Sequence, residues 1–177
     1  DLGRIHFATV NNDNEIFGAN IANVIKNEAD DQISRSSSLG NKTSDIIGGL
    51  RLNLNDNIKI KYDFSQDSNL KDTNFQIIES EFKVNNFVTS FEYLNENNTI
   101  KQQSYITNQT SYTMSDSKNI IFKTRKNKKT KLTEFYNLMY QYRNDCLVAG
   151  IEYNKEYYNS GKLKPEENIF IKLTIIP

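Results

Sequence analysis

The stretch GLRLNLNDNIKIKYDFSQ, residues 49–66, decides the fold class, because its apolar residues recur at every second position. Leu50 and Leu52 share one face of this pattern. After a short Asn-Asp-Asn break, Ile58 and Ile60 again share a face. Alternation with period two is typical of a half-buried β-strand. Two such strands joined by a short Asn/Asp turn predict a β-hairpin.

The same period continues along most of the chain from about Ile46 onward. Within Ile16–Ala29 the spacing of the apolar residues is ambiguous between helix and strand, and we expect a strand. The sequence therefore predicts an all-β protein built as an antiparallel up-and-down meander. Further strands are expected near Thr73–Val84, Phe87–Leu94, Ser104–Met114, Asn119–Lys123, Lys131–Tyr142, Cys146–Tyr158 and Asn168–Ile176.

The expected connections alternate between short and long. Short ones fall at Asn55–Asn57, Asn85–Asn86, Ser115–Lys118 and Arg143–Asp145. Longer polar ones fall at about Lys26–Asp45, Gln66–Asp72, Asn95–Gln103, Arg125–Thr130 and Asn159–Glu167. Outer-membrane barrels have this alternation, because their periplasmic turns are short and their external loops are long. A soluble antiparallel sheet shows the same apolar/polar pattern in its strands, so the pattern alone leaves both classes open.

Composition narrows the choice in one respect. The 177 residues include 22 basic and 22 acidic ones, so no charge bias points to nucleic acid. No run of about 20 apolar residues exists, which excludes a spanning helix but not a membrane β-barrel. A mean hydropathy of -0.68 fits either class.

The chain begins at Asp1 without a methionine or signal peptide and stops at Pro177, so we expect a piece of a larger protein.

Three stretches resemble a known family. They are SSSLGNKTSDIIGGL (Ser36–Leu50), YNLMYQYRNDCLVAGIEYNKEYY (Tyr136–Tyr158) and PEENIFIKLTIIP (Pro165–Pro177). They are similar to the C-terminal barrel region of LptD, the family of LPS-assembly or organic solvent tolerance proteins, in an alphaproteobacterial-like form. The resemblance runs from about Ser36 to the end of the chain and is most specific in the last third.

The resemblance implies a fold and a function. Residues 1–177 would be the C-terminal part of a large outer-membrane β-barrel, with the upstream strands and the periplasmic N-terminal domain absent. The function would be lipopolysaccharide transport and insertion into the outer leaflet of a Gram-negative outer membrane. The implied partners are lipopolysaccharide, an LptE-like plug lipoprotein inside the barrel, and the periplasmic Lpt bridge reached through the absent N-terminal domain.

In such a barrel the apolar rows of the strands would face lipid, and the charged rows would face the interior. The expected lipid-facing residues are Leu50, Leu52, Ile58, Ile60, Leu138, Ile151, Ile171 and Leu173. The expected inward-facing residues include Arg51, Lys59, Lys61, Asp63, Glu79, Glu81, Lys83, Glu152 and Lys172.

The densest charge cluster is KTRKNKKTK, Lys123–Lys131, which predicts a basic hairpin loop. It is either a solvated hairpin tip or a set of contacts to lipopolysaccharide phosphates. No aromatic residues are interleaved with the charges, so we do not expect nucleic-acid binding. The possible phosphate contacts are Lys123, Arg125, Lys126, Lys128, Lys129 and Lys131.

Cys146 is the single cysteine, just after the expected turn Arg143–Asp145. A lone thiol can behave as a small apolar side chain. If the final strand runs toward the periplasm, this turn is periplasmic and the thiol lies in an oxidising compartment. The resemblance implies that Cys146 forms a disulfide with a cysteine of the N-terminal domain, outside this chain.

No catalytic constellation is present in the sequence, so we do not expect an enzyme or a cofactor. His6 is the sole histidine and lacks ligand spacing to other residues, so we expect no metal site. Two alternatives remain open: a small outer-membrane barrel acting as a porin-like pore or anchor, and a soluble β-sheet binding module.

Overall fold

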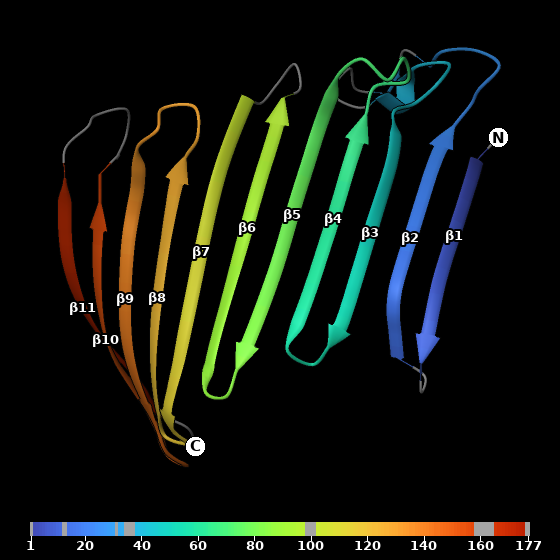
Figure 1. Cartoon of the computed structure of the whole chain (residues 1–177). Coiled ribbons are helices and arrows are strands. Elements are labelled where there is room, and N and C mark those ends of the chain that lie inside the picture. The colour runs from blue at the N-terminus through green and yellow to red at the C-terminus, as the bar shows by residue number, and fades with distance from the viewer. Residues whose placement is uncertain are drawn as a thin grey trace. The chain divides into compact units, whose positions relative to one another are not determined.

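The computed structural model describes residues 2–11, 14–30, 32–33, 38–97, 102–157 and 165–175. The described strands form one eleven-stranded sheet in which each strand pairs with its neighbours in sequence (Figure 1). The expected all-β antiparallel meander is therefore confirmed. The strands are β1 (Leu2–Asn11), β2 (Asn14–Val24), β3 (Ile46–Asn55), β4 (Ile58–Gln66), β5 (Thr73–Val84), β6 (Phe87–Asn97), β7 (Gln102–Ser115), β8 (Lys118–Asn127), β9 (Thr133–Arg143), β10 (Leu147–Glu156) and β11 (Glu166–Ile175).

The chain divides into two compact units. The first unit comprises Asp1–Ser80 and Tyr93–Ser104, and the second comprises Glu81–Glu92 and Tyr105–Pro177. Strands β1 to β4 belong to the first unit and β8 to β11 to the second, while β5, β6 and β7 contribute to both. A short 3₁₀ turn, η1 (Ser38–Gly40), lies in the connection from β2 to β3. None of the described residues forms a helix long and apolar enough to cross a membrane.

Among the connections that the structure describes, short and long ones alternate as the sequence predicts, whereas the expected long connections at Asn95–Gln103 and Asn159–Glu167 contain residues outside the described ranges. Residues 56–57, 85–86, 116–117 and 144–146 form the short turns, whereas residues 25–45, 67–72 and 128–132 form longer connections. Asparagine side chains organise the short turns by accepting backbone hydrogen bonds. Asn55 Oδ1 accepts from the N–H groups of Asn57 and Ile58 at 2.8 and 3.0 Å. Asn85 adopts a φ of 52°, a left-handed conformation that asparagine tolerates.

Several strand boundaries differ from the sequence prediction, and two of these differences involve candidate site residues. The segment from Arg125 to Asn127, expected to begin a loop, is the last part of β8. The reason is its partner strand: Arg125 pairs with Thr107, and Asn127 pairs with Tyr105, so the ladder continues through the basic residues. Cys146, expected to open a strand, lies in the turn before β10 instead.

In the first unit the strand register collects the apolar residues on one face, here called the apolar face. Leu50 pairs with Tyr62 and Leu52 with Ile60, so these side chains share a face. Phe17 pairs with Leu52 and extends the same row onto β2. The four predicted lipid-facing residues of β3 and β4 therefore lie together.

An aromatic ring covers a glycine on this face. The ring of Phe64 lies directly over Gly48, its cross-strand partner, where an added Cβ would come within 2.5 Å of the ring. Phe64 also stacks on Tyr62, with ring centroids 5.5 Å apart. Gly48 is thus the position that lets the ring lie flat against the sheet.

The second unit separates its two faces in the same way. Ile151 pairs with Ile171 on β11 and with Tyr140 on β9, and Tyr153 pairs with Leu138. The predicted lipid-facing residues of β9 to β11 therefore share the apolar face of this unit. Other members are Tyr112, Ile120, Phe122, Tyr136, Tyr142, Ala149, Ile169, Leu173 and Ile175.

These apolar side chains have no covering layer within the described part of the chain. No hydrophobic side chain among the described residues is buried, and the side chain of Ile171 is 80% exposed. Aromatic rings line the face: Phe122 lies 6.2 Å from Tyr136, which in turn lies 5.9 Å from Tyr157. A single sheet with one apolar and one polar face needs a second medium or partner against its apolar side.

Candidate functional site

The polar face of the first unit carries a small charge network. Lys61 Nζ lies 2.6 Å from a carboxylate oxygen of Asp63 and 3.0 Å from one of Glu79. Arg51 pairs with Lys61 across β3 and β4, which puts two cations side by side. The carboxylates of Asp63 and Glu79 compensate for that repulsion, so the network is a partly exposed cross-strand cluster rather than a concave site.

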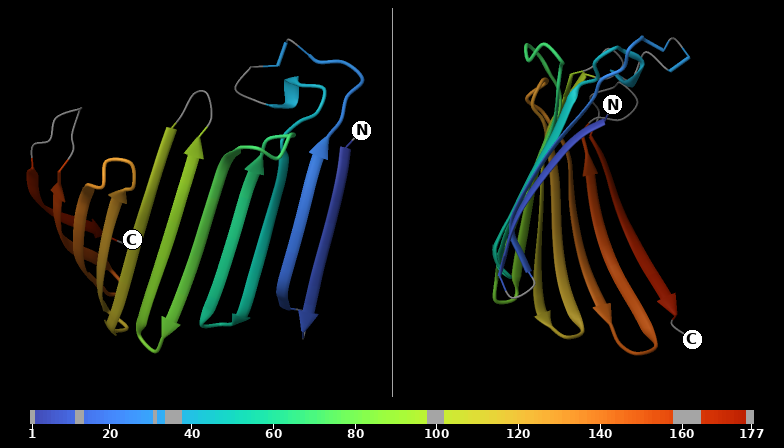
Figure 2. Two further views of the ribbon diagram at one scale, coloured as in Figure 1. Left: turned by 45° about the horizontal axis from the view of Figure 1, so that its top comes forward. Right: turned by 90° about the vertical axis from the view of Figure 1, so that its right-hand side faces the viewer.

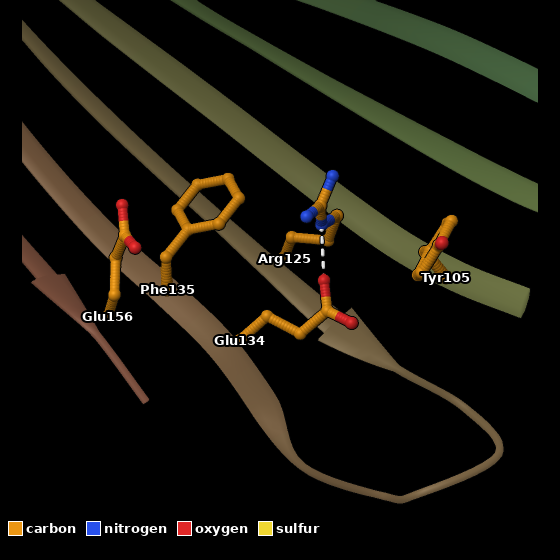
Figure 3. Close-up of a pocket in the computed structure, with 5 residues that line it drawn as sticks. All are labelled: Tyr105, Arg125, Glu134, Phe135 and Glu156. Atoms are coloured by element: carbon orange, nitrogen blue, oxygen red, sulfur yellow. Dashed lines mark hydrogen bonds and ion pairs between the residues drawn. The ribbon is translucent and has the colours of Figure 1, made fainter. Parts of the chain in front are cut away.

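A hollow on the polar face of the second unit brings more varied chemistry together. Figure 3 shows a pocket of about 430 Å³ lined by residues of four neighbouring strands, β7 to β10. Arg125 and Glu156 each pair with Phe135 across the strands, so these three side chains form one row. The pocket residues are Tyr105, Arg125, Glu134, Phe135 and Glu156.

Arg125 is held in a fixed position at the centre of this row. Its guanidinium carbon lies 5.0 Å from the ring centroid of Tyr105 and 5.1 Å from that of Phe135, so the cation sits between two aromatic rings. Its Nε lies 2.6 Å from Oε2 of Glu134. The other carboxylate oxygen of Glu134 accepts a hydrogen bond from Asn127 Nδ2 at 3.0 Å.

A β-bulge places Glu134 beside Arg125. The register between β8 and β9 shifts at this point: Arg125 pairs with Phe135, but Lys126 pairs with Thr133, so Glu134 is the extra residue. Simple alternation from Leu138 would put Glu134 on the apolar face. Bulges redirect a side chain in this way, and here the redirected carboxylate meets the guanidinium.

Farther along the second unit, a second polar cluster links β9, β10 and β11. Glu152 accepts a hydrogen bond from Asn137 Nδ2 at 2.5 Å and forms an ion pair with Lys172. The side chain of Glu152 is only 16% exposed, because its neighbours cover it. These contacts bridge three strands on the face opposite Ile151 and Ile171.

The basic segment does not form one cluster. Lys123 and Arg125 lie on the polar face of β8, whereas Lys126 lies on the opposite face, paired with Ile106 and Thr133. The remaining predicted phosphate contacts, Lys128, Lys129 and Lys131, lie in the connection from β8 to β9. The predicted phosphate contacts therefore divide into three groups, of which only the connection fits the expected basic loop.

The thiol of Cys146 is exposed and free. Its backbone N–H donates to Oδ1 of Asn144 at 3.0 Å, and the same oxygen accepts from Leu147 N–H at 2.8 Å. This side-chain bonding fixes the turn between β9 and β10 and leaves the thiol accessible from solvent. The predicted disulfide involves a residue outside this chain and stays a prediction.

Asp45 is a connecting residue whose role sequence reasoning missed. Its Oδ2 accepts hydrogen bonds from Ser65 Oγ at 3.0 Å and Asn74 Nδ2 at 2.8 Å. Its backbone N–H donates to Ser38 Oγ at 2.9 Å, and the preceding Ser44 is 4% exposed. One carboxylate therefore ties the connection from β2 to β3, visible beyond the ends of these strands in Figure 2, to β4 and β5. The Ser44-Asp45 pair just before β3 was the available signal in the sequence.

Metal chemistry finds no support in the described side chains. Among the residues the structure describes, no group of three or more His, Cys, Asp and Glu side chains is placed to hold a metal ion. Comparison with known proteins gives no further guide to chemistry: no protein-family model matches the sequence, and no curated protein is significantly similar to it.

Proposed function

We propose that the chain is part of an outer-membrane β-barrel that transports lipopolysaccharide and inserts it into the outer leaflet. The observation that carries the proposal is the uncovered apolar face of each unit, opposite a face of charged and hydrogen-bonded side chains. In a membrane barrel the apolar face meets lipid and the polar face lines the interior. The lipid-facing residues are then Leu50, Leu52, Ile58 and Ile60 in the first unit and Leu138, Ile151, Ile171 and Leu173 in the second.

The aromatic residues of β9 bear on the proposed membrane location. Tyr136 and Tyr142 lie on the apolar face toward opposite ends of the strand. They are six positions apart, about 20 Å along a β-strand. Because the strands of membrane barrels tilt by about 35–45°, this separation corresponds to about 15 Å of height, less than an apolar band about 25 Å tall. The pair therefore adds aromatic rings to the proposed lipid-facing surface but does not mark both borders of the band.

The transport function rests on the resemblance to LptD in the three quoted stretches. It implies lipopolysaccharide as the substrate, an LptE-like lipoprotein as the interior plug, and the periplasmic Lpt bridge as the supplier. Basic residues in the connection from β8 to β9, Lys128 and Lys129 among them, are the proposed contacts for lipopolysaccharide phosphates. The chain acts as a conduit rather than as an enzyme.

Depletion of the protein in its Gram-negative host tests this function. We expect lipopolysaccharide on the surface of intact cells to fall, with the amounts of unrelated outer-membrane barrels unchanged over the same interval. Unchanged surface lipopolysaccharide would contradict the transport function. Steady ion conductance of the purified protein in planar bilayers, together with normal surface lipopolysaccharide, would instead favour the porin-like alternative.

Location is tested separately by membrane fractionation. We expect the protein to sediment with the outer membrane and to resist extraction by urea at high pH. Release into the soluble fraction would favour the other alternative, a soluble β-sheet binding module. It would also contradict the proposed lipid-facing surface.

A further inference from the structure

The pocket around Arg125 has a charge balance that selects among ligand classes. One guanidinium lies in the pocket with two carboxylates, those of Glu134 and Glu156. A phosphate or carboxylate ligand would approach Arg125 against two negative charges, and a cationic ligand would meet a guanidinium fixed at the centre of the row. The balance therefore favours a neutral ligand over either ion.

The donors of the pocket are in place for such a ligand. Glu134 engages only Nε of Arg125, and within the described residues neither terminal guanidinium nitrogen has a hydrogen-bond partner. In Figure 3 a terminal nitrogen of Arg125 points away from Glu134. The two rings and the Glu134 carboxylate hold these donors in one orientation, which lowers the entropic cost of using them.

The pocket also offers an acceptor and an apolar surface. Glu156 accepts a hydrogen bond from Asn154 Nδ2 through Oε1 at 2.9 Å, and its Oε2 has no partner among the described residues. Phe135 stands between Glu156 and Arg125 (Figure 3). A ring between a fixed donor and an acceptor suits a molecule with hydroxyl groups at its edges and C–H groups on its face.

We propose that this pocket binds a neutral saccharide, with Arg125 donating to sugar hydroxyl oxygens and Glu156 accepting from sugar hydroxyl groups. The row spans β7 to β10, about 14 Å at the usual spacing between strands. It is open along its length, so it accommodates a short oligosaccharide lying across the strands better than a single enclosed sugar. The inference stands on the pocket alone and does not depend on lipopolysaccharide transport.

Saturation-transfer NMR on the purified full chain in detergent micelles tests this proposal. The probes are neutral trisaccharides of glucose and of N-acetylglucosamine, with inorganic phosphate as a competitor. We expect saturation transfer from the protein to the sugar protons, unaffected by phosphate. Arg125→Met should weaken binding at least about tenfold, because it removes charge-assisted hydrogen bonds. Gln109→Ala, on the same face of β7 and outside the pocket, should bind like the native protein.

A second variant guards against loss of folding. Glu156→Gln keeps the shape of the side chain, and it should weaken sugar binding by several-fold while the circular dichroism stays that of the native sheet. Absence of transfer to both trisaccharides, or equal transfer in the native protein and both pocket variants, would overturn the proposal. So would phosphate binding that is lost in Arg125→Met. Because the readout is binding by the isolated protein, these outcomes are independent of the depletion experiment.

Discussion

The two faces of the second unit are stabilised by different interactions. On the polar face, Glu152 joins Asn137 and Lys172, and Arg125 is fixed by Glu134, so each charge has a specific partner. On the apolar face, side chains contact their neighbours within the row, but no described residue lies over them. The polar face supplies partners for these charges from its own side chains, whereas the apolar face depends on its surroundings. The effects of substitutions on the two faces should therefore be detected by different measurements.

The largest expected effect tests the apolar face directly. Ile171→Lys places a charge at the middle of β11 on the apolar face, and it should oppose membrane insertion by about 2–4 kcal/mol. The matched control is Phe170→Lys, one residue away on the polar face, where a charge meets water. The measurement is the fraction of protein folded into lipid vesicles as a function of urea concentration. An equal loss of folded protein in both variants would mean that the two faces contact the same medium.

The assignment of side chains to the two faces was largely predictable, because the alternation along one strand does not depend on which strand pairs with it. Ile58 and Ile60 share a face by sequence parity alone, and the register bears this out. The pocket was not predictable in the same way. It depends on the register of four strands at once and on the bulge at Glu134, and a shift of one residue moves every side chain of a strand to the other face.

The local composition also led to a wrong prediction for the end of β8. Arg125, Lys126 and Asn127 lack an apolar alternation, so they resemble a loop in sequence. The pairing with Tyr105 and the rings around Arg125 keep them in the strand. These contacts join residues about 10 and 20 positions apart, Phe135 and Tyr105 with Arg125, and no local pattern encodes them.

A smaller effect is expected where a ring covers the backbone on the apolar face of the first unit. Gly48→Ala brings a methyl group within 2.5 Å of the Phe64 ring and 3.0 Å of a backbone oxygen of Asn20. The ring must leave the sheet, and we expect a loss of about 1–2 kcal/mol in the free energy of unfolding. Urea unfolding in micelles measures it. Gly3→Ala is the control: its nearest contact is 3.9 Å away, so it should be neutral or slightly stabilising.

The polar face should respond more weakly still. Glu152→Gln removes the ion pair with Lys172 but keeps an acceptor for Asn137, and we expect a loss of about 1 kcal/mol. A double-mutant cycle with Lys172→Met isolates the pair. Raising the salt concentration should shrink the coupling energy, since the side chain of Lys172 is 62% exposed. A coupling energy as large as the effect of Ile171→Lys would contradict the expectation that substitutions on the polar face have the smaller effect.

The smallest effect on folding is expected at Cys146, which lies in a turn outside both faces. Cys146→Ser should change the free energy of unfolding of this chain by less than about 0.5 kcal/mol, because the side chain is exposed and only its backbone N–H holds the turn. In the host the same substitution should abolish a disulfide-linked form seen on non-reducing gels. A thiol that reacts with maleimide in untreated cells would contradict the predicted disulfide. Unchanged stability together with a lost disulfide would show that this turn and the two faces have different roles. The faces would then stabilise the sheet, and the turn would link it to a residue elsewhere.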